Sequence, residues 1–369
     1  MTGAAHNGDG GATLLRVRHL AKRFPAGGTF SRKEIHAVED ATFDVERGQI
    51  VALVGESGSG KSTTARIIAR LTPPSGGEIW LKGHDVLKAE SRSASLAYRR
   101  AVQMVFQDPF GSLNPVHTIE HHVARPLRIH QNIGGGRMLR QKIYELLAMV
   151  GLNPPAEFAD KYPHELSGGQ RQRVAFARAL AAEPELVLAD EPVSMLDVSI
   201  RIGVLNLMDD LRQRTGLAYL YITHDIASAR YIADQTIVMY AGYMVEGGQT
   251  ERVIASPAHP YTQLLLSAVP DPQVGSAGRK LPGRGGVPSR IDPGPGCPFA
   301  GRCPHTMDVC RTVMPDPVTV ADGHWARCHL LDPTAAPGNG AAARRGSVEA
   351  PPAVRVAGAA GEQPGSPGR

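Results

Sequence analysis

The strongest constraint on the fold is a nine-residue stretch, which reads Gly55-Glu56-Ser57-Gly58-Ser59-Gly60-Lys61-Ser62-Thr63. It fits the phosphate-loop pattern G-x-x-x-x-G-K-[ST] without a mismatch. The apolar run Ile50–Val54 before it predicts a buried parallel strand, and residues 63–70 after it read as a helix. Because strand, glycine loop and helix follow one another in this order, we expect an α/β nucleotide-binding domain with a mainly parallel sheet.

The residue types in this stretch suit a polyphosphate. Its glycines let the backbone wrap closely around phosphates, and the loop N–H groups face the anion together with the positive end of the following helix. Lys61 is predicted to reach the β- and γ-phosphates, and the Ser62 hydroxyl is predicted to bind Mg²⁺. A glycine-rich turn without a nucleotide is the alternative, but it does not explain the full spacing with both flanking elements.

Length and composition leave the protein class broad. The chain has 369 residues, enough for two domains, with 42% hydrophobic and 20% charged residues. No apolar run approaches the ~20 residues of a membrane-spanning helix, and the first residues lack the apolar core of a signal peptide. The net charge of +5 permits contact with nucleic acid or acidic headgroups but argues for neither.

A second apolar run, Leu186–Ala189, ends in two carboxylates, Asp190 and Glu191. Ligands of open α/β sheets bind at the carboxyl ends of the strands, so both side chains are expected at the nucleotide. Asp190 is predicted to hold the Mg²⁺ shell, and Glu191 is predicted to polarise the attacking water. Without the phosphate loop, a solvated strand end would be the better interpretation.

The five residues Leu166-Ser167-Gly168-Gly169-Gln170 open a predicted helix with a hydroxyl and two glycines, a second arrangement suited to an anion. Here the chain resembles the ATP-binding cassette (ABC) family, whose signature is LSGGQ. The resemblance implies that Ser167, Gly168, Gly169 and Gln170 close over the nucleotide of a facing subunit rather than over the nucleotide of their own phosphate loop.

Further residues match the same family in order. Gln107 resembles the glutamine that senses Mg²⁺ and the attacking water, and His224 resembles the switch histidine that contacts the γ-phosphate. Asp197, in Ser194-Met195-Leu196-Asp197, resembles the loop that crosses the dimer interface, although the family more often has alanine where Met195 stands. The resemblance also implies an aromatic ring on the adenine, for which Phe24 is the candidate and Phe30 its rival.

Residues 105–115 and the triplet His259-Pro260-Tyr261 narrow the resemblance to the ATPase subunits of dipeptide, oligopeptide and nickel importers. This implies an ATPase that couples ATP hydrolysis to peptide uptake, located peripherally at the cytoplasmic face of the cell membrane. Implied partners are a second ABC ATPase subunit, as a homologous chain or a second copy, two membrane permease subunits and, indirectly, an extracytoplasmic solute-binding protein.

Two other functions stay open at this point. One is the import of nickel or another small solute. The other is a soluble ABC ATPase that acts on nucleic acid, although such proteins usually carry two cassettes or a long coiled-coil insertion, and this sequence has neither. We therefore expect no nucleic-acid partner.

All four cysteines, Cys297, Cys303, Cys310 and Cys328, lie in one late segment. This clustering predicts a shared ligand set, and four cysteines suit either Zn²⁺ or an iron–sulfur cluster. Their spacing differs from the C-x₂-C pairs of zinc ribbons. Resemblance to the importer subunits implies a [4Fe–4S] cluster, with Zn²⁺ as the alternative.

The predicted organisation has four parts. Residues 1–13 form a flexible tail, and 14–269 form the ABC ATPase domain with a helical subdomain at about 108–165. Residues 270–331 form a small C-terminal oligopeptide-transporter-type domain that carries the cysteines. Residues 332–369, rich in Ala, Gly and Pro, form a disordered tail.

Overall fold

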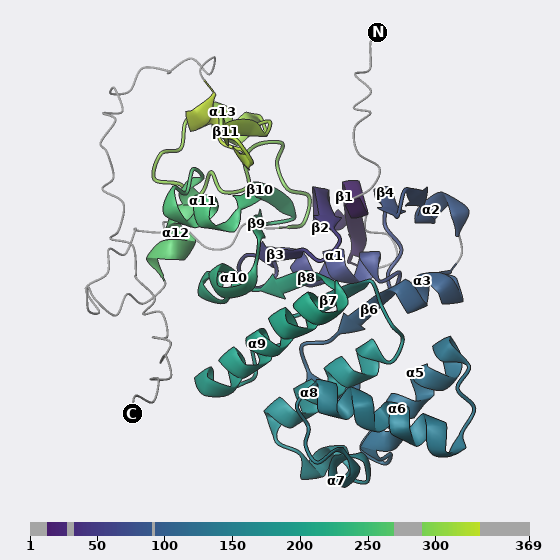
Figure 1. Ribbon diagram of the computed structural model, residues 1–369. Helices are drawn as coiled ribbons and strands as arrows, with labels where there is room; N and C mark the ends of the chain where they lie inside the picture. Colours follow the sequence, from purple (N-terminus) through teal and green to yellow (C-terminus); the bar gives the residue numbers. More distant parts are fainter. Residues whose placement is uncertain (1–12, 28–32, 91–92, 269–289, 333–369) are drawn as a thin grey trace, which may run out of the picture. The chain divides into compact units, whose positions relative to one another are not determined.

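The structure, a computed structural model, describes residues 13–27, 33–90, 93–268 and 290–332 (Figure 1). Apart from Thr13 and Asp332, both predicted terminal tails lie outside the described residues, as does Phe30. No helix in the described part of the chain has both the length and the apolar composition that crossing a membrane requires.

A parallel sheet forms the centre of the fold, with the strand order β9-β3-β8-β7-β6. Its strands are β3 (Ile50–Val54), β6 (Val102–Val105), β7 (Leu186–Asp190), β8 (Ala218–Thr223) and β9 (Gln235–Tyr240). Every residue of β3, β7 and β8 is buried, as expected for strands covered on both faces. Ile50, Ala52 and Val54 pack into one core and Val51 and Leu53 into another, which places one core on each face of the sheet.

An antiparallel part, β5-β4-β1-β2, extends the sheet. It consists of β1 (Thr13–Ala26), β2 (Lys33–Glu46), β4 (Gly76–Leu81) and β5 (His84–Asp85). The alternation of apolar and polar residues at Leu14–Leu20 predicts an edge strand. In the structure β1 is instead hydrogen-bonded along both edges and lies between β4 and β2. β10 (Tyr243–Gln249) joins the two parts by pairing with β9 and, at Tyr243, with Asp40 of β2.

A group of helices lies together on the side of the sheet near β6 and β7 (Figure 1). It contains α4 (Pro109–Ser112), α5 (Ile119–Gln131), α6 (Gly136–Met149), α7 (Pro155–Ala159) and α8 (Gly168–Leu180). The sequence predicts a helical stretch over residues 118–150 with a break at Gly134-Gly135-Gly136, and the structure has α5 and α6 there with the break at residues 132–135. The buried side chains of α6 are those that the spacing predicts: Leu139, Ile143, Leu146 and Leu147.

The remaining helices flank the sheet. They are α1 (Lys61–Ile68), α2 (Val86–Ala89), α3 (Leu96–Ala101), α9 (Val198–Thr215), α10 (Ile226–Ile232), α11 (Thr250–Ala255), α12 (Pro260–Ser267) and α13 (Val309–Thr312). α1 directly follows the glycine loop, so the predicted order of strand, loop and helix is found around residues 55–60.

The C-terminal segment continues the main sheet. β12 (His324–Ala326) pairs with β10 and with β11 (Val318–Ala321). The carboxylate of Glu246 in β10 accepts hydrogen bonds from the main-chain N–H groups of Ala258 (2.8 Å) and His259 (2.9 Å), and it lies 2.7 Å from Nε2 of His324. Glu246 is fully buried, so this network fixes the segment against the ATPase sheet, and the domain boundary at 269/270 stays a prediction.

Candidate functional site

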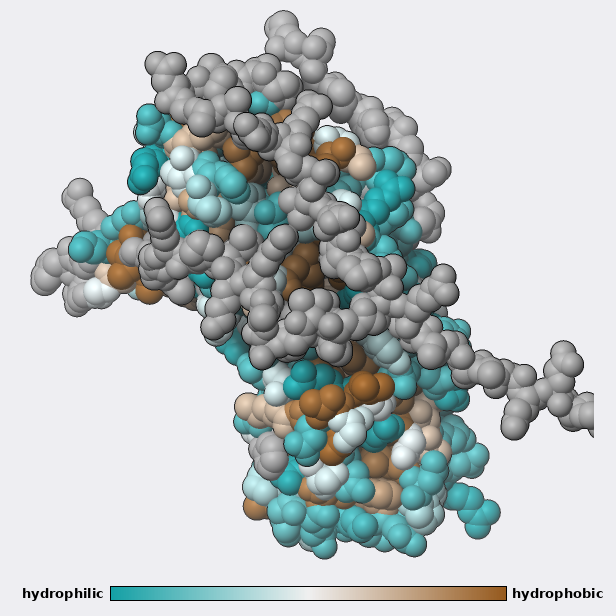
Figure 2. Space-filling view, turned by 90° about the vertical axis from the view of Figure 1, so that its left-hand side faces the viewer, coloured by the Kyte–Doolittle hydropathy of each residue, from teal (hydrophilic) through white to brown (hydrophobic). Residues whose placement is uncertain are grey.

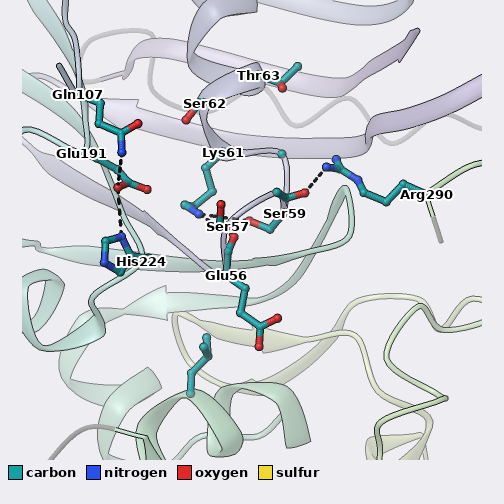
Figure 3. A pocket seen from close by; sticks show the side chains of 13 residues that line it. Glu56, Ser57, Ser59, Lys61, Ser62, Thr63, Gln107, Glu191, His224 and Arg290 are labelled. Atoms are coloured by element: carbon teal, nitrogen blue, oxygen red, sulfur yellow. Dashed lines mark hydrogen bonds and ion pairs between the residues drawn. The ribbon is translucent and has the colours of Figure 1, made fainter. Parts of the chain in front are cut away.

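A cavity of about 550 Å³ lies over the phosphate loop (Figure 3). Its lining consists of Glu56, Ser57, Gly58, Ser59, Gly60, Lys61, Ser62, Thr63, Gln107, Glu191, His224, Leu265 and Arg290. The structure thus brings most of the predicted nucleotide-binding residues of the loop together with the three predicted catalytic residues.

The loop turns sharply at Gly60, where φ is +112°, and α1 starts at the next residue. A Cβ at Gly60 would lie 2.4 Å from the carbonyl oxygen of Ala37, so only glycine fits there. The Lys61 ammonium donates to the carbonyls of Gly55 (2.7 Å) and Glu56 (2.9 Å). Burial lowers the pKa of Lys61, while nearby carboxylates, chiefly Glu191, act in the opposite direction.

Ser62 and Asp190 meet at the start of α1 and the end of β7. The Ser62 hydroxyl donates to Oδ1 of Asp190 at 2.7 Å, although Asp190 is not among the cavity-lining residues. Burial raises the pKa of Asp190, and the adjacent Glu191 adds to this, whereas the Ser62 hydrogen bond opposes it. A hydroxyl and a carboxylate beside the loop are oxygen donors of the kind Mg²⁺ prefers, so these residues fit the predicted ion.

Glu191 follows β7, and its carboxylate contacts side chains that follow the two neighbouring strands. Its Oε2 lies 3.1 Å from Nε2 of Gln107, which follows β6, and 3.1 Å from Nδ1 of His224, which follows β8. Figure 3 shows these three side chains together on one side of Lys61. Parallel neighbouring strands end at the same edge, so residues 84 and 33 positions from Glu191 in the chain contact the same carboxylate.

The other predicted nucleotide residues do not line this cavity. Ser167 caps α8: its hydroxyl accepts the N–H of Gln170 at 3.3 Å, and the Gln170 side chain accepts the N–H of Ser167 at 2.9 Å. Asp197 occupies the N-cap position of α9. Phe24 lies on β1 with 37% of its surface exposed, and the Lys22 ammonium stands 4.8 Å from its ring centroid. Gly168 and Gly169 begin α8.

Sequence reasoning missed two cavity residues, Leu265 and Arg290. The guanidinium of Arg290 donates to the carbonyls of Gly58 and Ala37, and in Figure 3 it approaches the loop from the side opposite to Glu191. Both residues come from the C-terminal part of the chain and belong to no nucleotide motif. No local pattern could identify Arg290, because its contact with Gly58 joins residues 232 positions apart in the chain.

The predicted iron–sulfur cluster is wrong. Cys297, Cys303, Cys310 and Cys328 line one small hollow, yet within the described residues no group of three or more His, Cys, Asp or Glu side chains is arranged to hold a metal ion. The zinc alternative therefore finds no ligand set there either. Burial raises the pKa of the Cys297, Cys303 and Cys328 thiols, for Cys297 to about 11, which disfavours the thiolates that either metal would need. The clustering in sequence predicted a shared ligand set, but the structure shows only a shared hollow.

Comparison with known proteins gives two family models that match this chain. The first, described as "ABC transporter", matches residues 38–194, and the second, described as "Oligopeptide/dipeptide transporter, C-terminal region", matches residues 245–310. The chain is 44% identical over 323 residues to the oligopeptide transport ATP-binding protein AppF of Bacillus subtilis, covering 86% of this chain and 97% of the relative. It is 41% identical over 321 residues to the dipeptide transport ATP-binding protein DppF of Escherichia coli, with 86% and 95% covered.

Solved structures with a similar fold include the ATP-binding cassette MJ0796 in a dimeric post-hydrolysis state bound to ADP and Pi. That match has a TM-score of 0.56 and 29% identity and covers 64% of this chain and 99% of the other. CbiO1 of Clostridium perfringens, part of the transporter complex cbiONQ, matches with a TM-score of 0.58 and 26% identity over 67% of this chain and 92% of the other. These matches confirm the predicted α/β phosphate-loop fold class.

Proposed function

Because this chain belongs to the ABC transporter family, among ATP-binding subunits of the oligopeptide and dipeptide type, we propose that its ATPase activity drives the uptake of peptides. AppF and DppF are named for oligopeptide and dipeptide transport, and the family model at residues 245–310 describes the C-terminal region of such transporters. Nickel or another small solute remains the second candidate cargo.

One observation carries the proposal that the site is catalytic: Gln107 and His224 both lie 3.1 Å from Oε2 of Glu191, at the edge of the phosphate-loop cavity. Glu191 orients the attacking water and accepts its proton, while Gln107 and His224 hold the carboxylate in place. Lys61 neutralises phosphate charge. Phosphoryl transfer needs chiefly this positioning and electrostatic stabilisation.

Ser62, Asp190 and Gln107 are the residues we assign to Mg²⁺. Ser62 and Gln107 line the cavity, and Asp190 accepts the Ser62 hydroxyl at 2.7 Å. When bound, the ion screens the charge of the phosphate oxygens. Asp190 orients the Ser62 hydroxyl so that its oxygen faces the cavity, and this is the role the hydrogen bond between them supports.

We assign the signature residues to the nucleotide of a facing ATPase subunit. Ser167 is exposed at the start of α8 and does not line the cavity over the phosphate loop of the same chain, which supports this assignment. Apolar side chains just before α9 and in its first turns are exposed as well, among them Met195, Val198 and Ile202. Figure 2 shows one face of the molecule, on which hydrophobic residues gather in groups among hydrophilic ones. Exposed apolar groups of this kind suit a protein interface.

The transporter would also contain two permease subunits and, indirectly, a solute-binding protein, with this chain at the cytoplasmic face of the membrane. We place the permease contact on the helical group after Gln107, where Val116 and Met138 are exposed. The cavity of this chain is lined mostly by phosphate-loop residues, which suit a nucleotide rather than a transported solute. We therefore assign the choice of the transported solute to the other subunits.

Reconstitution tests this function. The full chain, co-purified from membranes with its associated subunits and placed in vesicles, should take up labelled di- and oligopeptides when ATP is supplied, and Glu191→Gln should abolish the uptake. Uptake of nickel but not of peptides would replace the peptide assignment by the second candidate. Peptide uptake that continues unchanged with Glu191→Gln would show that ATP hydrolysis at this site does not drive transport.

A further inference from the structure

Glu56, the second residue of the phosphate loop, is held at three places at once. Its main-chain N–H donates to the hydroxyl of Tyr261 at 2.9 Å, and its carbonyl accepts the Lys61 ammonium at 2.9 Å. Its carboxylate accepts two hydrogen bonds from the Arg302 guanidinium, at 2.8 and 3.0 Å. Tyr261 and Arg302 both belong to the C-terminal part of the chain, so that part contacts the loop directly.

Arg302 is fixed by its own surroundings. Its guanidinium carbon lies 5.7 Å from the ring centroid of Tyr240 and 5.8 Å from that of Phe299, and it also donates to the Tyr240 hydroxyl at 3.3 Å. The hydrogen bonds to Glu56 raise the pKa of Arg302 above its ordinary value. Only 15% of the Arg302 side chain is exposed, so the guanidinium has little freedom to leave Glu56.

The turn that carries Arg302 lies between two of the cysteines. The Phe299 carbonyl accepts the N–H groups of Arg302 and Cys303, both at 2.9 Å, and the Cys297 carbonyl accepts the N–H of Ala300 at 3.0 Å. The segment predicted to bind a metal thus presents an arginine to the phosphate loop.

Tyr261 is anchored in a similar way. It is fully buried, and its ring lies tilted against the ring of Tyr240, with 4.4 Å between the ring centroids. His259 accepts the N–H of Tyr261 at 3.0 Å, and Glu246 accepts the N–H of His259. The His259-Pro260-Tyr261 triplet therefore places a hydroxyl at a fixed point beside the loop.

We propose that Arg302 and Tyr261 are positioning residues of the ATP site, which keep the Glu56 carboxylate away from the phosphates and hold the loop in its binding shape. Glu56 lines the cavity, and in Figure 3 its side chain points away from Lys61. A carboxylate released from Arg302 would stand beside a polyphosphate and repel it. Arg302 and Tyr261 support nucleotide binding in the ground state and the transition state alike. Loss of either residue should therefore raise KM more than it lowers kcat.

This inference rests on the proposed use of the loop for ATP, but its test needs no transport. The equilibrium dissociation constants of MgATP and MgADP are measured on the full chain, with unfolding temperatures in parallel. Arg302→Gln should weaken MgATP binding about tenfold, and less so at high salt, which screens the repulsion. Tyr261→Phe keeps the packing of the ring and should weaken binding by a smaller factor.

The decisive variant is the double change Glu56→Gln with Arg302→Gln. It removes the carboxylate that Arg302 neutralises, so binding should return to within about threefold of the unaltered chain. Arg327→Gln is the matched control, because Arg327 pairs with Asp40 at similar burial and also ties the C-terminal segment to the main sheet, but neither residue lines the cavity. It should lower the unfolding temperature without changing the dissociation constant.

Each outcome decides the proposal. Weaker binding with Arg302→Gln, rescue by the added Glu56→Gln and no effect of Arg327→Gln support it. Equal weakening by the Arg302 and Arg327 changes, or no rescue in the double variant, would overturn it and leave Arg302 a structural residue. Absence of MgATP binding by the unaltered chain would instead contradict the proposed function itself.

Discussion

The hydroxyl of Ser62 lies 2.7 Å from Oδ1 of Asp190, although 128 residues separate the two in the chain. Ser62 is the second residue of α1, the helix after the phosphate loop, and Asp190 ends β7, which lies two places from β3 in the sheet. The sheet thus connects the residue predicted to bind Mg²⁺ with the carboxylate predicted to hold the shell of that ion.

Asp190→Asn should raise the Mg²⁺ concentration needed for half-maximal ATPase activity at least tenfold, because the amide lacks the charge that the carboxylate offers to the ion. Titration of ATPase activity with Mg²⁺ at fixed ATP measures this. Asp210→Asn, which removes an exposed carboxylate paired with Arg214, is the control and should leave the titration unchanged. Identical titrations for all three chains would remove Asp190 from the metal site.

Glu191→Gln should lower kcat for ATP by about 10²–10⁴, because a positioned base contributes roughly that much to proton transfer. The amide is nearly the same shape as the carboxylate, so MgATP binding should change little. Single-turnover hydrolysis and equilibrium binding, measured on the assembled transporter, separate the two effects. Retention of more than a tenth of the rate would assign the base to another group.

The local parts of this site follow from the sequence, because each motif sits at the end of an apolar strand. Residues 55–63, Asp190-Glu191 and His224 each follow such a run, and parallel strands deliver their ends to one edge of the sheet. The period of the helix at 136–149 likewise predicts its buried face. These inferences succeed because they need only neighbouring residues and one rule of sheet geometry.

The contacts made by the C-terminal part could not be predicted in this way. Glu56 and Arg302 stand 246 residues apart, and nothing near either residue indicates the other. The strand β1 reads as an edge because alternation reports one buried face but not which strands lie beside it. The cysteines share a hollow without forming a metal site, since clustering in sequence does not set the directions of the side chains.

Ser167→Ala should distinguish what each of the two chains contributes to the proposed ATP site. It should leave MgATP binding by the full chain on its own unchanged, and it should lower ATP hydrolysis by the assembled transporter about ten- to hundredfold, because the hydroxyl acts on the nucleotide of the facing subunit. Ser95→Ala removes a comparable helix cap, in which the Ser95 hydroxyl accepts the N–H of Tyr98 at 3.0 Å, and serves as the control. Weaker binding by the single chain with Ser167→Ala would place the signature on the chain's own nucleotide.

The buried histidine of the His259-Pro260-Tyr261 triplet should make folding sensitive to acid. Burial lowers the pKa of His259 from 6.5 to about 4. The unfolded chain therefore binds one more proton than the folded chain between these values, and stability falls as the pH drops through this window. The contribution of neutral His259 to the free energy of unfolding is complete above pH 6.5. It declines by about 3 kcal/mol on reaching pH 4, at 1.36 kcal/mol per pH unit.

Asparagine at this position tests the acid sensitivity, because its side chain can still accept the N–H of Tyr261 but does not titrate. Urea unfolding between pH 4 and pH 7.5 should give a shallower loss of the free energy of unfolding for His259→Asn than for the unaltered chain. His84→Asn, a change at an exposed histidine, should leave the slope as it is. Equal slopes for the unaltered chain and His259→Asn would mean that protonation of other buried groups governs unfolding in acid.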